Sequence, residues 1–214
     1  SRRRHTRYPL VTGVQTCALP ICRGGGYWLF KSIFLNEMFE KMEYGDALIY
    51  IDAGVEITKN IDIFFEIAKN NDGFCLFQHP HSNFKFIKRD CFILMGCDDK
   101  VYHDSYQSDA AIQIYIKNEI TYNFIREYLN YCSDERILTD LPNTCGLQNL
   151  DGFVDHRHDQ SILTLLCLKN KINRFKQPTQ FYLEWNGMES ILNPLEMEIS
   201  NKYSVSFNHH RERI

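Results

Sequence analysis

Two groups of polar side chains in this chain have types and positions that could do chemistry. The first is Asp52, which follows the apolar run 47–51 and precedes a turn at Gly54. Ligands of open α/β sheets bind beyond the carboxyl ends of strands, and a carboxylate there could hold a divalent cation against a phosphate. The alternative is that Asp52 only caps a turn or a helix. Its position alone does not decide between a binding role and this structural role.

The second group is the unbroken polar stretch 155–161, Asp-His-Arg-His-Asp-Gln-Ser, directly before an apolar run. A helix N-terminus would account for one capping aspartate but not for the two histidines, the arginine and the glutamine. His156 and His158 alternate as in metallohydrolases. However, the binuclear pattern places its aspartate two residues after the second histidine, whereas Asp159 is adjacent. The spacing therefore argues against a metallohydrolase, and a helix N-terminus leaves most of the stretch unexplained.

Three weaker signals lie elsewhere. The segment 203–207 alternates like a strand, which would carry His209 and His210 to the edge of a sheet, although a polar tail is the default for a chain end. Lys31 lies on an expected helix and could reach a phosphate, although a solvated lysine is the default. The segment 79–81, His-Pro-His, has no metal spacing and is expected in a loop.

Apolar periodicity predicts the elements that must position these groups. The continuous run 47–51 is typical of a strand covered on both faces in a parallel sheet. The order strand, helix, strand over 47–77 predicts a βαβ unit, and a loop over 133–157 is expected to be functional because of its length. We predict strands at 47–51, 74–77, 110–116 and 203–207, and helices at 27–42, 60–69, 88–95, 119–132 and 161–168.

Composition excludes several classes of protein. The 214 residues suit one domain, and the net charge of −3 argues against a general nucleic-acid binder. No apolar run approaches the roughly 18–20 residues that span a bilayer. The six cysteines after residue 23 form no CxxC pair, so buried free thiols in a reducing, cytoplasmic compartment are expected.

Residues 1–23 differ from the rest of the chain. They contain five arginines and no acid, whereas the remaining residues carry a net charge of −8. A signal peptide and a basic contact arm are two interpretations. The string 11–22 resembles a translated sequencing-adapter read, which favours an artefactual leader. We therefore expect a domain over 24–214 that lacks its first strand and helix.

The motifs together resemble a family of bacterial glycosyltransferases with the GT-A fold that are linked to surface-polysaccharide synthesis. The resemblance covers about residues 26–214, is specific at 48–54 and 155–161, and is loose elsewhere. It implies a single Rossmann-like α/β domain that transfers a sugar from a nucleotide-sugar to a glycan or lipid-linked acceptor. A lipid-linked acceptor would bring the protein to the inner face of the membrane.

The resemblance also implies a metal site. In that fold a strand ends in Asp-x-Asp, which holds Mn²⁺ or Mg²⁺ against the diphosphate of the donor. In this chain the second carboxylate after Asp52 is absent. Glu56, His209 or His210 would then supply the missing ligand, and Lys31 would assist with the phosphates.

Further roles follow from the same resemblance. The pair Asp159 and Gln160 is similar to the Asp-Gln pair of the retaining glycosyltransferases that include glycogenin, where it faces the donor sugar. Asp109 loosely matches a donor-binding segment of those enzymes. Asp155 would bind the donor, and Asp155, His156 and His158 would line the cleft. His156 would act as a general base if the reaction inverts the anomeric centre.

Two alternatives stay open. One is a non-catalytic nucleotide- or glycan-binding module on the same fold, which the lone Asp52 motivates. The other is a metal-dependent phosphoesterase built on His156 and His158.

If residues 1–23 are a leader with no periodic apolar face, deleting them should leave the melting temperature unchanged, because they bury little surface. Differential scanning calorimetry of the deleted and full-length chains tests this. A fall in melting temperature beyond measurement error would contradict the leader interpretation.

Overall fold

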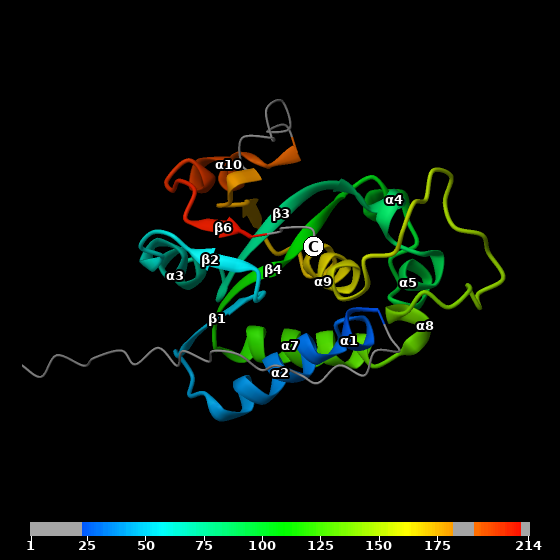
Figure 1. Ribbon diagram of the computed structural model, residues 1–214, viewed down its shortest axis with the longest axis horizontal. Coiled ribbons are helices and arrows are strands. Elements are labelled where there is room, and N and C mark those ends of the chain that lie inside the picture. Colours follow the sequence, from blue (N-terminus) through cyan, green and yellow to red (C-terminus); the bar gives the residue numbers. More distant parts are fainter. Residues whose placement is uncertain (1–22, 182–190, 211–214) are drawn as a thin grey trace, which may run out of the picture.

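The computed structural model describes residues 23–181 and 191–210, which form a mixed α/β structure around a four-stranded sheet (Figure 1). The strand order is β1-β4-β3-β5. β4 pairs antiparallel with both β1 and β3, and β5 pairs parallel with β3. A separate antiparallel pair joins β2 and β6. The strands are β1 (Ala47–Ile51), β2 (Val55–Ile57), β3 (Phe74–Ser82), β4 (Tyr106–Ile116), β5 (Arg174–Lys176) and β6 (Phe207–His209).

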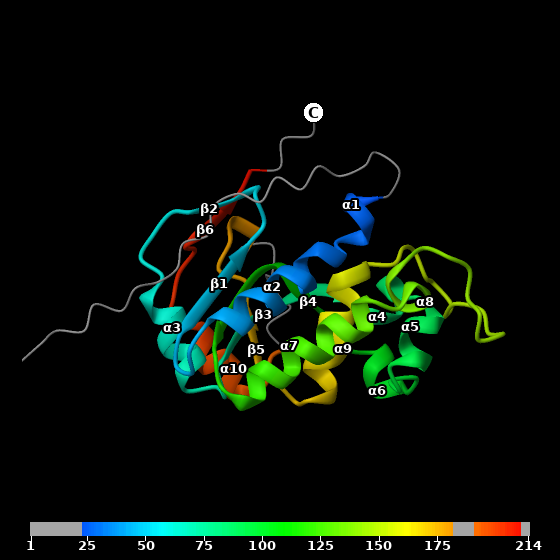
Figure 2. The ribbon, with the colours of Figure 1, turned by 90° about the horizontal axis from the view of Figure 1, so that it is seen from below.

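Helices cover both faces of the sheet (Figures 1 and 2). α2, α7 and α9 pack on one face, while α3 and α10 lie on the other with the β2–β6 pair. The helices are α1 (Gly24–Tyr27), α2 (Leu29–Lys41), α3 (Asp62–Lys69), α4 (Asn83–Phe86), α5 (Arg89–Leu94), α6 (Lys100–His103), α7 (Glu119–Cys132), α8 (Glu135–Leu138), α9 (His158–Lys169) and α10 (Pro194–Ser200).

The alternation of side chains along the strands builds a separate core on each face. In β3, Leu76 belongs to the core under α7 and α9, whereas Cys75 and Phe77 belong to the core under α3. In β4, Tyr115 and Ile114 divide in the same way. Because successive strand residues point to opposite faces, both faces of the sheet bury apolar side chains.

The expected α/β class and βαβ order are present, and the expected parallel sheet is present in part, because β1, β3 and β5 run in one direction and β4 runs against them. β1 and β3 are joined through α3, yet β4 lies between them and is antiparallel to both. A continuous apolar run shows that both faces of a strand are covered, and this occurs in antiparallel sheets as well when helices cover both faces.

Several expected boundaries move. β4 begins at Tyr106 rather than at Ala110, because its first residues are polar yet buried. The strand expected at 203–207 is irregular until Phe207, where β6 begins. α2 begins at Leu29, since the residues from Gly24 to Trp28 all have positive φ. The long loop 133–157 contains the short helix α8.

Other expectations are met in part. All six cysteines within the described residues are free, and five are buried. Within residues 23–181 and 191–210, no helix has the length and apolar character needed to cross a membrane. Residues 1–22 of the expected leader lie outside the described residues.

The turn into β3 requires a glycine. Gly73 has a φ of +91°, and a Cβ there would lie 2.7 Å from the Ile116 carbonyl oxygen. Gly73→Ala should therefore lower the free energy of unfolding by about 2–4 kcal/mol through backbone strain and overlap. Gly96→Ala is the matched control, because Gly96 has a φ of +68° with nothing within 4 Å of its Cβ position, so only strain of about 1–2 kcal/mol is expected.

Urea unfolding of the two variants measures both values. Equal losses would show that the overlap at Gly73 relaxes without cost.

Candidate functional site

A polar cavity of about 370 Å³ lies where the end of β1, the first half of β4 and the start of α9 meet. The side chains around it come from positions far apart in the sequence and include most of the residues singled out above. They are Arg23, Trp28, Lys31, Asp52, His79, His81, Asp109, Ala110, Ala111, His156, Arg157, His158, Asp159, Gln160, Gln177, Phe181 and His209.

A buried ion group of Lys31, Asp52 and Asp159 lies on the wall of this cavity. The Lys31 Nζ is 3.0 Å from Asp52 Oδ1 and 3.3 Å from Asp159 Oδ2. It also donates to the Ala110 carbonyl oxygen at 3.4 Å. The side chains of Lys31 and Asp159 are only 4% and 5% exposed, whereas that of Asp52 is 32% exposed. Lys31 is therefore a structural counter-ion and not the solvated lysine that is usual on a helix.

Burial and charge perturb the members of the ion group in opposite ways. Burial raises the pKa of Asp159 to about 6; the Lys31 ammonium opposes this rise and Asp52 adds to it. Burial lowers the pKa of Lys31, but the two carboxylates outweigh it and the net direction is upward. The Tyr50 hydroxyl donates to Asp52 Oδ1 at 2.8 Å, and burial raises the pKa of Tyr50. A carboxyl with a pKa near neutrality at a cavity is suited to proton transfer.

Asp109 lies beside this group on β4 and is fully hydrogen-bonded. Its Oδ1 accepts from the Ala111 N–H at 2.8 Å and its Oδ2 accepts from the Gln177 amide at 2.7 Å. Burial raises the pKa of Asp109, against the effect of these hydrogen bonds. Gln160 in turn donates to Gln107 at 3.3 Å, which orients its amide at the cavity.

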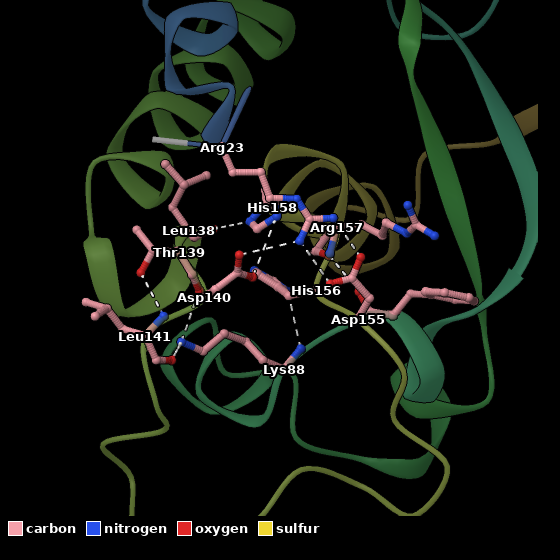
Figure 3. A network of polar contacts seen from close by, with 12 residues as sticks. Arg23, Lys88, Leu138, Thr139, Asp140, Leu141, Asp155, His156, Arg157 and His158 are labelled. Atoms are coloured by element: carbon pink, nitrogen blue, oxygen red, sulfur yellow. Dashed lines mark hydrogen bonds and ion pairs between the residues drawn. The ribbon is translucent and has the colours of Figure 1, made fainter. Parts of the chain in front are cut away.

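His156 lines the cavity, but both of its ring nitrogens are occupied. Nδ1 accepts from the Lys88 N–H at 3.3 Å (Figure 3). Nε2 donates to the Ile137 carbonyl at 2.8 Å. Burial and the nearby His158 lower its pKa well below the ordinary value. In this geometry neither nitrogen can take a proton from a substrate, so the role of general base expected for His156 has no structural support.

His158 has a different environment. Its Nδ1 donates to the Leu138 carbonyl at 2.8 Å, and its ring stacks on Trp28 with centroids 5.5 Å apart. Its Nε2 lies 3.7 Å from Asp140 and makes no hydrogen bond with the described residues (Figure 3). His158 also has a φ of +52°, which a bulky residue rarely adopts and which occurs where surrounding structure imposes it.

Asp155 lies beside the cavity but does not line it. It forms an ion pair with Arg23, whose two terminal nitrogens lie 3.2 and 2.9 Å from its carboxylate oxygens (Figure 3). Burial raises the pKa of Asp155, but the Arg23 hydrogen bonds and charge reverse this and hold it below the usual value. Arg23 also reaches Asp140 at 3.5 Å. Asp155 was expected at the donor, whereas in the structure its carboxylate is ion-paired with Arg23.

The expected metal ligands come together only in part, because Asp52 and His209 line the same cavity and His210 does not. His209 lines the cavity, but His210 lies outside it and pairs with Glu56 at 2.7 Å on the exposed β2–β6 pair. No group of three or more His, Cys, Asp or Glu within residues 23–181 and 191–210 is arranged to hold a metal ion. Beside Asp52 the positive charge is already supplied by Lys31. The residues as placed do not fit the expected Mn²⁺ or Mg²⁺ site.

Sequence reasoning did not assign several residues that line the cavity. His79 and His81 were expected in a plain loop, but they end β3 with ring centroids 4.1 Å apart. Gln177 follows β5, whose three residues are too few to show a period. One signal was available: two histidines at alternate positions after an apolar strand point to the same face.

Comparisons of this chain with protein families, with curated proteins and with solved structures found no match. The resemblance to GT-A glycosyltransferases therefore rests on the motifs alone.

The raised pKa of Asp159 predicts how stability depends on pH. The folded chain holds a proton on this carboxyl up to about pH 6, whereas an unfolded aspartate releases it near pH 3.9. The stability it contributes is present below pH 4 and is lost as the pH rises to 6, by roughly 3 kcal/mol. The difference in unfolding free energy between wild type and Asp159→Asn should change by this amount over that window, as measured by urea unfolding.

Asp151→Asn, in an exposed turn, is the control and should show a constant difference from wild type. A constant difference for Asp159→Asn from pH 4 to pH 7 would contradict the perturbed pKa.

Proposed function

We propose that this protein is a glycosyltransferase that transfers a sugar from a nucleotide-sugar donor to a glycan or lipid-linked acceptor in bacterial surface-polysaccharide synthesis. The observation that carries the proposal is the ion group, which joins the strand-end Asp52 to Asp159 of the Asp-Gln pair through Lys31. The two motifs that motivated the resemblance are 107 positions apart, yet they line one cavity.

The size and polarity of the cavity support a ligand of this class. Its volume of about 370 Å³ lies within the range of small-molecule sites, roughly 300–1,000 Å³. Asp159 Oδ2 is buried without a hydrogen bond, although Lys31 lies 3.3 Å away. It could accept from a sugar hydroxyl, and the Gln160 amide beside it offers both a donor and an acceptor.

Asp159 and Gln160 are proposed to contact the donor sugar near the reacting carbon. The carboxylate of Asp159 would stabilise positive charge that develops on the sugar as the bond to the diphosphate breaks. Lys31 holds this carboxylate in place and is a positioning residue. Because the site geometry does not fit a metal, no step of the reaction is assigned to a cation, and dependence on Mn²⁺ or Mg²⁺ stays a prediction from the sequence.

The two alternatives differ in their support. A phosphoesterase needs His156 and His158 as ligands or acid–base groups, and both nitrogens of His156 are hydrogen-bonded to backbone. A non-catalytic binding module shares every contact described above and differs only in the absence of turnover.

Asp159→Asn and Asp52→Asn should each lower the hydrolysis or transfer of a nucleotide-sugar such as UDP-glucose by about 100-fold or more. Loss of a charge that stabilises the transition state has this size. Their melting temperatures should stay within a few degrees of wild type, because Asn is nearly isosteric with Asp. Donor turnover and UDP titration, each with and without Mn²⁺, measure the effect.

Asp151→Asn is the matched control and should be fully active. Full activity of Asp159→Asn would leave only a helix-start role for that residue and remove most of the support for a transferase. Binding of UDP with no turnover of any donor would favour the binding module.

A further inference from the structure

Three consecutive residues at the start of α9 each bring to the cavity wall a buried polar atom without a hydrogen bond among the described residues. The atoms are Arg157 Nε, His158 Nε2 and Asp159 Oδ2. Buried polar atoms in proteins are nearly always paired, so each exception needs an explanation. Because Asp159 Oδ2 is ion-paired with Lys31 at 3.3 Å, it is the two neighbouring atoms, Arg157 Nε and His158 Nε2, which indicate that a bound ligand supplies their partners.

The charges around the cavity identify which cation is available to a ligand. Lys31 is shared by Asp52 and Asp159, and its side chain is only 4% exposed. The ion group therefore carries one net negative charge at neutral pH, which repels an anion. Arg23 is paired with Asp155. Among the cations that line the cavity, Arg157 alone has no carboxylate within ion-pair distance in the described part of the chain.

Arg157 is also held in place. Its backbone N–H donates to the Phe86 carbonyl at 3.1 Å and to Ser161 Oγ at 3.2 Å. Its guanidinium lies over the ring of Phe86, 4.8 Å from the centroid. On the same ring stacks His81, with centroids 4.6 Å apart, and His81 also lines the cavity. The cation is therefore fixed by packing and hydrogen bonds without being neutralised.

We propose that Arg157 forms a phosphate-binding subsite of the cavity and that the diphosphate of the donor binds there, not at Lys31. An arginine offers a planar fork of N–H donors that matches the oxygens of a phosphate. His81 adds a ring nitrogen at the same end of the cavity. This inference rests on the proposed function for the identity of the ligand. The subsite itself rests only on the charge and contacts of Arg157.

The arrangement divides the cavity by chemistry. Arg157 and His81 form an end of the cavity that is suited to phosphate. The first turn of α9 presents Asp159 and Gln160 to sugar hydroxyls. In a nucleotide-sugar the diphosphate is bonded directly to the sugar ring that carries the hydroxyls, and the residues from Arg157 to Gln160 are likewise close neighbours in the chain.

Isothermal titration with inorganic pyrophosphate, UDP and uridine tests the subsite directly. Arg157→Gln should bind pyrophosphate and UDP about 10- to 100-fold more weakly than wild type, the usual effect of losing hydrogen bonds to a charged group. Binding of uridine, which has no phosphate, should not change. Arg126→Gln is the matched control, because Arg126 is exposed, lies 5.7 Å from the ring centroid of Tyr122, and does not line the cavity.

Arg157→Lys keeps the charge over Phe86 but loses the fork, so it should bind pyrophosphate with an intermediate affinity; it also serves if Arg157→Gln does not fold. Wild-type affinity for pyrophosphate in the Arg157 variants, or no binding of pyrophosphate or UDP by the wild type, would overturn the subsite. Arg157-dependent binding without turnover of any sugar donor would support the subsite and remove the transferase. Donor turnover with an unchanged KM in Arg157→Gln would support the transferase and overturn the subsite.

Discussion

The structure around the cavity depends on the burial of one lysine between two carboxylates. Lys31 comes from α2, Asp52 from the end of β1 and Asp159 from the start of α9, so the ion group ties three elements together. A single charge buried without its partners would cost several kcal/mol, which disfavours any arrangement that separates them. The same burial leaves Asp159 with a pKa of about 6, and its Oδ2 at the cavity has the Lys31 ammonium as its partner, 3.3 Å away.

Backbone groups fix the other side of the cavity. The carbonyls of Ile137 and Leu138 in α8 accept from the rings of His156 and His158, which sets the tautomer of each ring. The loop that follows α8 is tied down in turn. Asp90, which is fully buried, accepts from the N–H groups of residues 144 and 145. Against the effect of burial, hydrogen bonds from the side chain of Cys145 and from these backbone groups lower the pKa of Asp90 to about 2. Part of a long loop without regular structure is thus held in place.

The central position of β4 in the sheet explains why acidic and amide side chains of this strand reach the cavity. β4 is antiparallel to both of its neighbours, so its first residues lie beside the end of β1, where Asp52 begins the turn. Its first half is polar and buried, and Asp109 there is satisfied by the Ala111 N–H and by Gln177. The proposed sugar end of the cavity is formed by the start of α9, and the proposed phosphate end by Arg157, which precedes α9, and His81 of β3.

The sequence alone predicts the α/β class, five of the ten helices and three of the six strands in the described part of the chain, and the placement of Asp52 at a strand end and of Asp159 and Gln160 near a helix start. Each follows from local apolar periodicity, which depends on neighbours in the chain. Only the tertiary structure decided the antiparallel position of β4, the inward role of Lys31, the hydrogen-bonded state of His156 and the separation of His210 from the cavity. Periodicity reveals that a position is buried but not which side chain it meets. A strand covered on both faces has the same pattern whichever direction its neighbours run. Charge pairing and strand order depend on contacts between residues distant in sequence, and no local pattern encodes them.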